Sequence, residues 1–428
     1  MRVLFISTRY AGGGAERSAR ELLQGIATAA GASVAMIVSA RAGDEPDFVR
    51  GARLPGERAL RILEKLRPPQ VDWIHLGARL ALGRATPDRY DLVHVHNVHG
   101  GWMSLKALSR LCRRLPCVWT LHDEWGPSAG VAYDLSGVGG KYGAQIRAMP
   151  GADVLFPDTL VSQRFRRVFD RWSPQPQTII SPSQYIKQLA ERSGRFPGAE
   201  VVNLPYGVRT PQMAESTAAQ AEARRRFDLA PEDRVVLLMA AHLGSPVKGI
   251  SPAVDALRTL RPDAFKLLVV GGGGDFIARH VPQRVVETGY LHDDRALVQA
   301  YRVADLTLIP SVADNFPYVG LESMACERPI VSFRIGGLAE MVGDADERGL
   351  AAEPFDVAEL GRHVMTLLGA PDLRSRLGAA GRRWVSDRCD VDQWIRTHLD
   401  LYRRAIAAFH SGSATHAVAA ARPTEAVR

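Results

Sequence analysis

Residues 306–337 read LTLIPSVADNFPYVGLESMACERPIVSFRIGG, and this stretch decides the fold. Two short apolar runs, at 306–309 and 329–333, are separated by a segment of helix length. Apolar runs that alternate with helices are typical of βαβ units, whose parallel strands are buried on both faces. Asp314 and Glu322 stand eight positions apart, in the loop after the first run and at the start of the helix. A polar, often anionic, ligand is expected there, because such sheets bind ligands at strand ends and helix N-termini.

The same alternation runs through the rest of the chain. Further strands are predicted in the first half at 3–7, 34–38, 92–96 and 117–121, and in the second half at 235–240, 266–270 and 285–289. Helical patterns separate them, as at 15–26 and 102–111. The sequence therefore predicts an α/β protein with two doubly wound, Rossmann-like domains and a cleft between them.

The division into domains follows from two further patterns. A turn-forming break, PYGV at 205–208, precedes a polar segment and indicates the junction. Apolar side chains recur at helical spacing over 391–409, which predicts a terminal helix that packs along one face and that could cross back to the first domain. The expected division is 1–207 and 208–385 for the two domains, 386–410 for the terminal helix and 411–428 for a flexible tail.

Length and composition limit the classes of protein to consider. The chain has 428 residues, 46% of them hydrophobic and 23% charged, which is typical of a globular protein with more than one domain. It has no apolar run long enough to cross a bilayer and begins with a strand pattern, so a cytoplasmic location is expected. The net charge of +8 favours phosphorylated ligands, and without a recognised binding motif we expect no nucleic acid partner. The four cysteines lack the spacing of a zinc site or a disulfide framework.

A glycine-rich loop follows the first predicted strand. Gly12, Gly13 and Gly14 precede a helix that begins near Ala15, and glycine lets the backbone approach a ligand closely. Free N–H groups at the helix start favour an anion, so a phosphate or a sugar hydroxyl could bind there. A tight structural turn explains the glycines equally well. The absence of a spaced GxGxxG pattern argues against a nicotinamide enzyme.

Histidines gather near the ends of two predicted strands. His94, His96 and His99 invite a metal site, but one strand rarely supplies a full set of zinc ligands, so packing is the favoured explanation. His96 ends its strand at the edge where open α/β sheets bind ligands. His122 and Asp123 follow the next strand, where the imidazole could donate to or orient a hydroxyl. A purely structural histidine explains His122 equally well.

A lysine follows the first strand predicted for the second domain. Lys248 lies in the segment LGSPVKG at 243–249, and its mobile ammonium suits phosphate oxygens. A solvated surface lysine is the alternative. A glycine run at 271–274 ends another strand and could contact a nucleotide, or it could simply connect the sheet to a helix.

These motifs, taken in this order, resemble the retaining glycosyltransferases of family 4, which have the GT-B fold. Asp314 and Glu322 are similar to the family's two acids separated by seven residues. The family usually has glutamate at the first of these positions, so Asp314 is one methylene shorter. His242 stands six positions before Lys248, where the family usually has an arginine. The resemblance covers most of the chain.

The resemblance implies a role for each matched position. It implies catalytic roles for His122, Lys248 and Asp314, donor-binding roles for Gly13, Gly14, His242, Asn315, Phe316 and Glu322, and acceptor-side roles for His96 and Asp123. The implied enzyme is a hexosyltransferase that moves a sugar from a nucleotide diphosphate sugar to an acceptor hydroxyl. It would need no metal or other cofactor, because the lysine and backbone N–H groups stabilise the leaving diphosphate. A carbohydrate or lipid-linked acceptor, in polysaccharide or glycolipid assembly, is the implied second substrate.

Two other functions fit the same donor. A GT-B nucleotide-sugar epimerase would convert the nucleotide sugar without an acceptor. A non-catalytic sugar-nucleotide-binding scaffold is suggested by the two departures from the family pattern, His242 and the shorter Asp314.

One stretch suggests a possible membrane contact. Residues 164–172, RFRRVFDRW, mix cations with aromatic side chains and could rest on the anionic inner face of a plasma membrane. A solvated helix with one buried face is the favoured explanation of this stretch.

Overall fold

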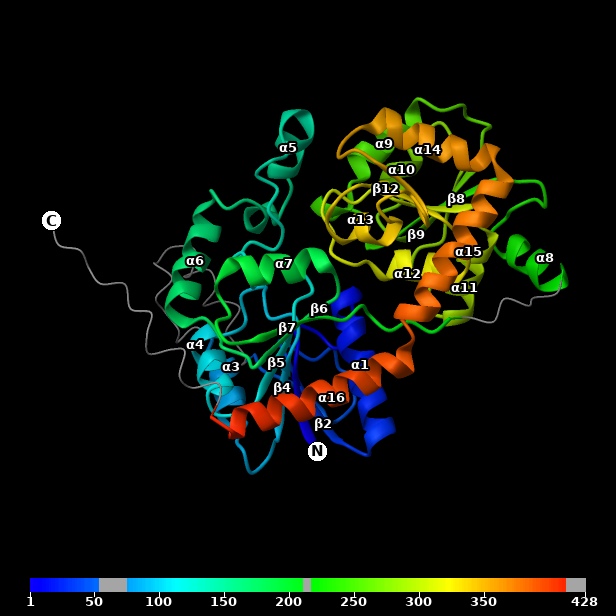
Figure 1. Cartoon of the computed structure of the whole chain (residues 1–428). Coiled ribbons are helices and arrows are strands. Elements are labelled where there is room, and N and C mark those ends of the chain that lie inside the picture. The colour runs from blue at the N-terminus through cyan, green and yellow to red at the C-terminus, as the bar shows by residue number, and fades with distance from the viewer. Residues whose placement is uncertain (54–74, 211–216, 413–428) are drawn as a thin grey trace. The chain divides into compact units, whose positions relative to one another are not determined.

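The computed structural model describes residues 1–53, 75–210 and 217–412, which form two compact units (Figure 1). Unit 1 comprises Met1–Ser136, Asp153–Leu204 and the described chain from Trp394 onward. Unit 2 comprises Gly137–Ala152 and Pro205–Gln393. Of the tail expected at 411–428, the part from residue 413 lies outside the described residues.

Unit 1 is built on a seven-stranded sheet whose paired strands are all parallel. In spatial order the strands are β3 (Val49–Gly51), β2 (Ser33–Val38), β1 (Arg2–Ile6), β4 (Leu92–Val95), β5 (Cys117–Thr120), β6 (Thr178–Ser181) and β7 (Glu200–Asn203). Strands β4 and β5 are buried at every position, as expected for a parallel sheet covered on both faces. The strand order reverses between β1 and β4, where such a sheet binds its ligands.

Three of the described helices of unit 1 begin at polar caps. The unit 1 helices named here are α1 (Gly14–Ala30), α3 (Leu76–Gly83), α4 (Leu105–Cys112), α6 (Leu160–Trp172), α7 (Gln184–Ser193) and the larger part of α16 (Val391–His410). Ser104, Thr159 and Ser183 precede α4, α6 and α7, and each side chain accepts a hydrogen bond from the N–H three positions on. Such caps satisfy backbone donors that the helix itself leaves unpaired, which explains where these helices begin.

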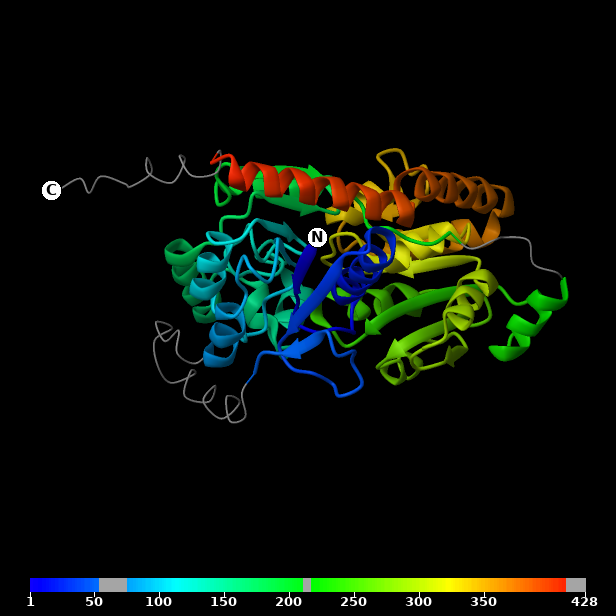
Figure 2. The same cartoon turned by 90° about the horizontal axis from the view of Figure 1, so that it is seen from below.

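The long helix α16 lies along the rest of unit 1 (Figure 2). Most side chains of the apolar stripe expected from the sequence are buried. Trp394 and Tyr402 are buried, and the Tyr402 hydroxyl lies 2.5 Å from Nδ1 of His94 on β4. A Cβ on Gly25 of α1 would lie 2.3 Å from Cδ1 of Ile395, so any larger residue there would displace the Ile395 side chain. The glycine therefore permits the close approach of α1 and α16.

Unit 2 contains a six-stranded sheet, again with parallel pairing. In spatial order the strands are β10 (Val285–Glu287), β9 (Lys266–Gly272), β8 (Val235–His242), β11 (Leu306–Ile309), β12 (Ile330–Phe333) and β13 (Gly349–Ala352). Its described helices are α5 (Gly140–Arg147), α8 (Thr217–Arg226), α9 (Ile250–Arg258), α10 (Asp275–Ala278), α11 (Asp294–Val303), α12 (Tyr318–Ala325), α13 (Gly336–Val342), α14 (Val357–Gly369) and α15 (Pro371–Arg388). Its strand order reverses between β8 and β11.

The segment that carries α5 belongs to unit 2, although it lies between β5 and β6 in the sequence. The Tyr142 hydroxyl donates to Oδ2 of Asp255 at 2.7 Å, and Nζ of Lys141 lies 2.7 Å from the same oxygen. The Tyr142 ring also stacks on Phe355, with 5.6 Å between ring centroids. These contacts account for its grouping with unit 2, although it lies within the range 1–207 suggested for the first domain.

Nine strands expected from the sequence are present, with ends that differ by at most two residues. The structure adds four that the sequence pattern did not predict: β3, β6, β7 and β13. Two doubly wound, Rossmann-like sheets are thus confirmed. Within the described part of the chain, no helix combines the length and the apolar character needed to span a bilayer.

Candidate functional site

Two loops of unit 2 meet at the carboxyl ends of β8 and β11, where the strand order reverses. The N–H of Val312 in the second loop donates to the carbonyl of Val247 in the first at 2.9 Å. Gly249 has a φ of +64°, and a Cβ there would lie 1.8 Å from the carbonyl oxygen of Pro310, so only glycine fits. The two loops, which carry the lysine and the first acid of the predicted site, are therefore in direct contact.

Lys248 and Asp314 form an ion pair at this point. Nζ of Lys248 lies 2.6 Å from Oδ2 of Asp314, and the Ser311 hydroxyl donates to the same oxygen at 3.1 Å. The Asp314 side chain is 10% exposed and that of Lys248 is 30% exposed, so the pair is only partly open to water. The sequence suggested that the two groups hold different parts of a ligand, and the structure brings them together. Ser311 was missed, because nothing in its sequence context distinguishes it from other loop serines.

The residues after Asp314 contribute mainly backbone to this loop surface. Asn315 and Phe316 were expected to bind a ligand, but their side chains are buried. The Phe316 ring packs with Tyr206 and Trp384 at centroid distances of 6.3 and 6.0 Å. Phe316 is thus a core residue, and the loop can offer a ligand its peptide groups at this position.

Glu322 lies in α12 and is positioned by a tyrosine from another helix. Its Oε2 accepts a hydrogen bond from the Tyr301 hydroxyl of α11 at 2.7 Å, and Glu322 is 9% exposed. The same hydroxyl lies 3.3 Å from the sulfur of Met239 on β8. Tyr301 was not predicted as a site residue, because it reads as one member of the apolar stripe of α11.

His242 ends β8, and its side chain is exposed. Its Nδ1 lies 3.0 Å from the hydroxyl of Tyr290, which follows β10, and the two rings meet edge to face at 6.1 Å. Tyr290 is 47% exposed. An imidazole and a phenol ring are therefore available together at the carboxyl ends of these strands.

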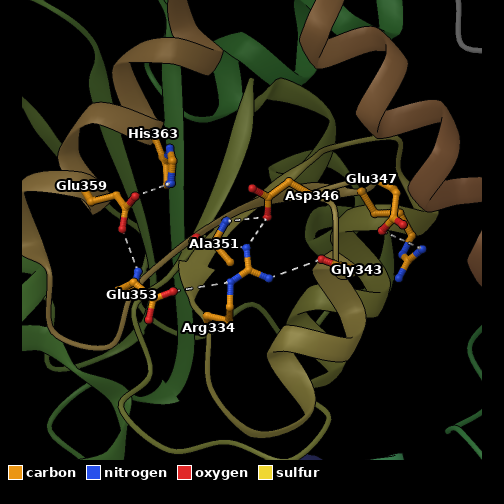
Figure 3. A network of polar contacts seen from close by, with 9 residues as sticks. Arg334, Gly343, Asp346, Glu347, Ala351, Glu353, Glu359 and His363 are labelled. Atoms are coloured by element: carbon orange, nitrogen blue, oxygen red, sulfur yellow. Dashed lines mark hydrogen bonds and ion pairs between the residues drawn. The ribbon is translucent and has the colours of Figure 1, made fainter.

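Figure 3 shows a further cation near the carboxyl end of the sheet. Arg334 follows β12, and its Nη2 donates to Oδ1 of Asp346 at 2.8 Å, while Nη1 reaches the carbonyl of Gly343 at 3.5 Å. Its Nε also lies 4.0 Å from a carboxylate oxygen of Glu353. These partners connect the segments around α13 and β13, so Arg334 stabilises the fold at this sheet edge.

The glycine loop of unit 1 begins α1, next to the point where that sheet reverses its strand order. Gly13 is the N-terminal cap position of α1 and Gly14 is its first residue. Gly13 has no side chain to satisfy the free N–H groups of the first turn. The Glu16 carboxylate lies over this loop, with Oε2 3.4 Å from where a Cβ of Gly13 would sit.

Two histidines after β4 hold the two predicted site residues after β5. Nδ1 of His96 lies 2.9 Å from Nε2 of His122, and Nε2 of His99 lies 2.8 Å from Oδ2 of Asp123. The indole N–H of Trp119 donates to the carbonyl of His96 at 3.1 Å and fixes the first of these loops. All five residues line one small pocket of unit 1.

His94 does not line this pocket, and both of its ring nitrogens contact hydroxyl groups. Its Nδ1 lies 2.5 Å from the Tyr402 hydroxyl, and its Nε2 lies 2.8 Å from Oγ1 of Thr120. Its ring is 4.1 Å from that of His96 between centroids. In the described ranges, no group of three or more His, Cys, Asp or Glu side chains is arranged to hold a metal ion.

Burial and charge set the protonation of these imidazoles. Burial lowers the pKa of His122 to about 4 and holds the pKa of His96 well below its usual range, so both rings are neutral near pH 7. Burial also opposes the charge on His99, but the Asp123 carboxylate outweighs it and raises the pKa of His99. The pocket therefore combines two neutral imidazoles with one imidazole that is paired to a carboxylate.

Comparison with known families gives two matches, one mainly in unit 1 and one within unit 2. Residues 12–211 match the family described as Glycosyltransferase Family 4, and residues 234–370 match Glycosyl transferases group 1. A D-inositol 3-phosphate glycosyltransferase of Acidothermus cellulolyticus is 30% identical over 341 residues, which are 75% of this chain and 68% of that protein.

Two solved structures share the fold. Sucrose-phosphate synthase from Thermosynechococcus elongatus superposes with a TM-score of 0.73 at 21% identity, over 95% of this chain and 100% of that one. HepE of Anabaena, solved in complex with UDP-glucose, superposes with a TM-score of 0.63 at 20% identity, over 94% and 100% of the two chains.

Proposed function

The chain belongs to family 4 of the glycosyltransferases, enzymes of the GT-B fold, and on this premise we propose that it transfers a sugar from a nucleotide diphosphate sugar to an acceptor hydroxyl with retention of configuration. The observation that carries the proposal is the contact of Lys248 with Asp314 at the carboxyl ends of β8 and β11. It joins a cation suited to phosphate with a carboxylate suited to hydroxyl groups at the ligand-binding edge of an open sheet. The complex of HepE with UDP-glucose supports the choice of donor class.

In the proposed reaction, the bond between the anomeric carbon and the diphosphate oxygen breaks. A bond from that carbon to the acceptor oxygen forms on the same face, and the acceptor proton passes to the departing phosphate. Lys248 stabilises the negative charge that develops on the diphosphate, because a preorganised donor in a partly buried site needs little reorganisation. We propose that this ammonium supplies the charge that a divalent cation provides in other transferases.

The remaining residues of unit 2 complete the donor site in this proposal. Asp314 orients the sugar hydroxyls, together with the peptide groups of the loop that follows it. Glu322 accepts hydrogen bonds from the ribose, and Tyr301 holds its carboxylate in place. His242 takes the diphosphate position that an arginine usually has, and Tyr290 orients its ring.

Unit 1 supplies the acceptor side and part of the donor contact in this proposal. Gly13 and Gly14 offer free N–H groups at the start of α1 to the diphosphate. His122 contacts the donor sugar near its reacting carbon, whereas His96 and Asp123 serve the acceptor side. Each of these three residues contacts a histidine of the same pocket, which supports a site of fixed geometry.

We also propose that the acceptor is a carbohydrate or lipid-linked molecule and that α6 rests on an anionic membrane surface. Arg166, Arg167 and Arg171 are exposed, and no described carboxylate forms an ion pair with them. Two cations lie over the ring of Trp172, with Nζ of Lys106 at 5.0 Å and Arg171 at 5.5 Å from its centroid. Cations beside an aromatic ring suit the headgroup region of an anionic leaflet.

A donor screen followed by product analysis tests the function. Thermal unfolding is measured with UDP, GDP, TDP and ADP sugars, because a ligand that binds only the folded protein raises its apparent stability. The stabilising donor is then incubated with and without carbohydrate and lipid-linked acceptors. Transfer that requires an acceptor supports the proposal, whereas conversion of the donor alone indicates an epimerase. Stabilisation without turnover on any acceptor indicates a binding scaffold.

A further inference from the structure

The contact between His96 and His122 also determines which ring nitrogens carry a proton. Nδ1 of His96 and Nε2 of His122 are 2.9 Å apart, which is a hydrogen-bond distance. Both rings are neutral near pH 7, so each carries one ring proton and offers one acceptor. One of the two facing nitrogens must therefore carry the proton, and the other must accept.

The second nitrogen of His96 decides which ring donates. His96 is 2% exposed, and no described residue makes a hydrogen bond to its buried Nε2. If the His96 proton were on Nε2, a buried N–H group would have no acceptor, and orphaned buried donors are rare. An unprotonated Nε2 costs less free energy on burial than an unpaired N–H group at the same place. His96 then buries no N–H donor without an acceptor. The proton of His96 therefore belongs on Nδ1.

The packing around His96 keeps its ring in this orientation. Its ring stacks on Phe5 at 5.8 Å and lies against His94 at 4.1 Å between centroids. His94 cannot serve Nε2 of His96, because both of its own ring nitrogens are occupied by the hydroxyls of Tyr402 and Thr120. A flip of the His96 ring would move Nδ1 away from His122 and break their contact. The packing therefore keeps Nδ1 of His96 facing His122.

We propose that His96 is a positioning residue that donates from Nδ1–H to Nε2 of His122 and thereby fixes His122 as its Nδ1–H tautomer. His122 then carries its ring proton at Nδ1 and has no basic nitrogen there. For the reaction, and resting on the proposed function, His122 does not remove the acceptor proton. His99 acts in parallel on the neighbouring residue, because its imidazole holds the Asp123 carboxylate at 2.8 Å.

Nitrogen NMR on the donor-free protein tests the tautomer directly. The chain is labelled with ¹⁵N in its histidine rings, and His122→Gln identifies the His122 signals. We expect the Nδ1–H pattern for His122 and, in His96→Leu, a shift of its population toward Nε2–H. An Nε2–H tautomer for His122 in the unsubstituted protein overturns the proposal. This measurement needs no substrate, so it stands even if the proposed transfer is not found.

Kinetics test the positioning role. His96→Leu removes the donor, whereas His96→Asn keeps an amide N–H near the position of Nδ1. By analogy with outer-shell partners that orient ligating histidines, we expect His96→Leu to lower kcat about 10-fold to 100-fold, with little change in KM for the donor. His96→Asn should recover most of that loss.

The matched control is His398→Phe, because His398 is a buried histidine of the same core that lies 5.8 Å from His94 and makes no hydrogen bond to the pocket loops. It should lower thermal stability but leave kcat near the original value. An unchanged kcat in His96→Leu, or an equal loss in His398→Phe, contradicts the positioning role.

Discussion

Nζ of Lys248 lies 2.6 Å from Oδ2 of Asp314, across two loops that follow neighbouring strands of the unit 2 sheet. The pair keeps the ammonium at the strand ends before a donor is bound. In the proposed function, a diphosphate that enters this point would compete with Asp314 for the ammonium, and the carboxylate would become available to the sugar hydroxyls. On this proposal, binding of an anion at Lys248 would release Asp314.

The first prediction concerns this ion pair. Lys248→Ala and Asp314→Ala should each lower the rate of sugar transfer about 100-fold to 1,000-fold, because each removes a group aimed at the reacting donor. The rate is measured as acceptor-dependent release of the nucleotide. Near-normal turnover in both variants would refute the assignment of this site.

A matched control exists in the same sheet. Lys266 begins β9, and its Nζ lies 2.6 Å from Oδ2 of Asp233, at the opposite, amino end of the strands. Lys266→Ala breaks an equivalent lysine–aspartate contact away from the ligand-binding edge. It should change stability slightly and leave the transfer rate unaffected.

The second prediction concerns Tyr301. Tyr301→Phe removes the hydroxyl that holds Glu322, so it should weaken nucleotide binding several-fold and lower the free energy of unfolding by about 1 to 3 kcal/mol. Calorimetric titration and chemical denaturation measure the two effects. Tyr185→Phe is the control, because the Tyr185 hydroxyl donates to Oε1 of Glu124 in unit 1 at the same distance of 2.7 Å. Equal losses of nucleotide affinity in the two variants would argue against a role of Tyr301 at the donor site.

The sequence predicted nine strands from their apolar runs and missed four of those that the structure describes. β13 reads GLAA, which has little strand propensity, and it forms because β12 offers a partner. β6 is a run of only four residues, TIIS, at the limit of what an apolar pattern can distinguish. These strands therefore form because a neighbouring strand pairs with them, and a sequence pattern read along one segment does not show that pairing.

The candidate site shows the same division. Residues in the loops after a strand, such as His122, Lys248 and Asp314, could be proposed as site residues because parallel sheets place ligands at that edge and because their motifs resemble those of the family. The groups that position them come from other elements. Tyr301 reads as the core of a helix, and the contact of His96 with His122 joins two loops 26 residues apart. A pattern read along one segment contains no information about such partners.

The third prediction concerns the exposed arginines of α6. Arg166→Glu, Arg167→Glu and Arg171→Glu, made together, should abolish binding to vesicles that contain phosphatidylglycerol, because three attractive charges become repulsive. Sedimentation with vesicles at low and high salt measures the effect, and salt should weaken binding of the original protein. Binding that persists in the triple variant would contradict a membrane contact through α6.

The control for this surface is a triple charge reversal elsewhere in the chain. Arg258, Arg261 and Arg279 belong to unit 2, in or near α9 and α10, so their replacement by glutamate changes the net charge by the same amount. It should weaken vesicle binding much less. Equal effects of the two triple variants would mean that only the net charge of the protein matters.

The last prediction concerns acid stability and the buried histidines. Burial lowers the pKa of His122 and of His398 to about 4, and it holds the pKa values of His94 and His96 well below the usual range. Below the ordinary value of about 6.5, the unfolded chain binds protons that the folded protein does not, so stability must fall as the pH falls from 6.5 toward 4. Each such histidine contributes a slope of about 1.4 kcal/mol per pH unit in that window. His398→Phe should therefore flatten the dependence of the unfolding free energy on pH by about that amount. Parallel stability curves for His398→Phe and the original protein between pH 6.5 and 4 would show that His398 is not held neutral, because a neutral buried imidazole cannot avoid this linkage.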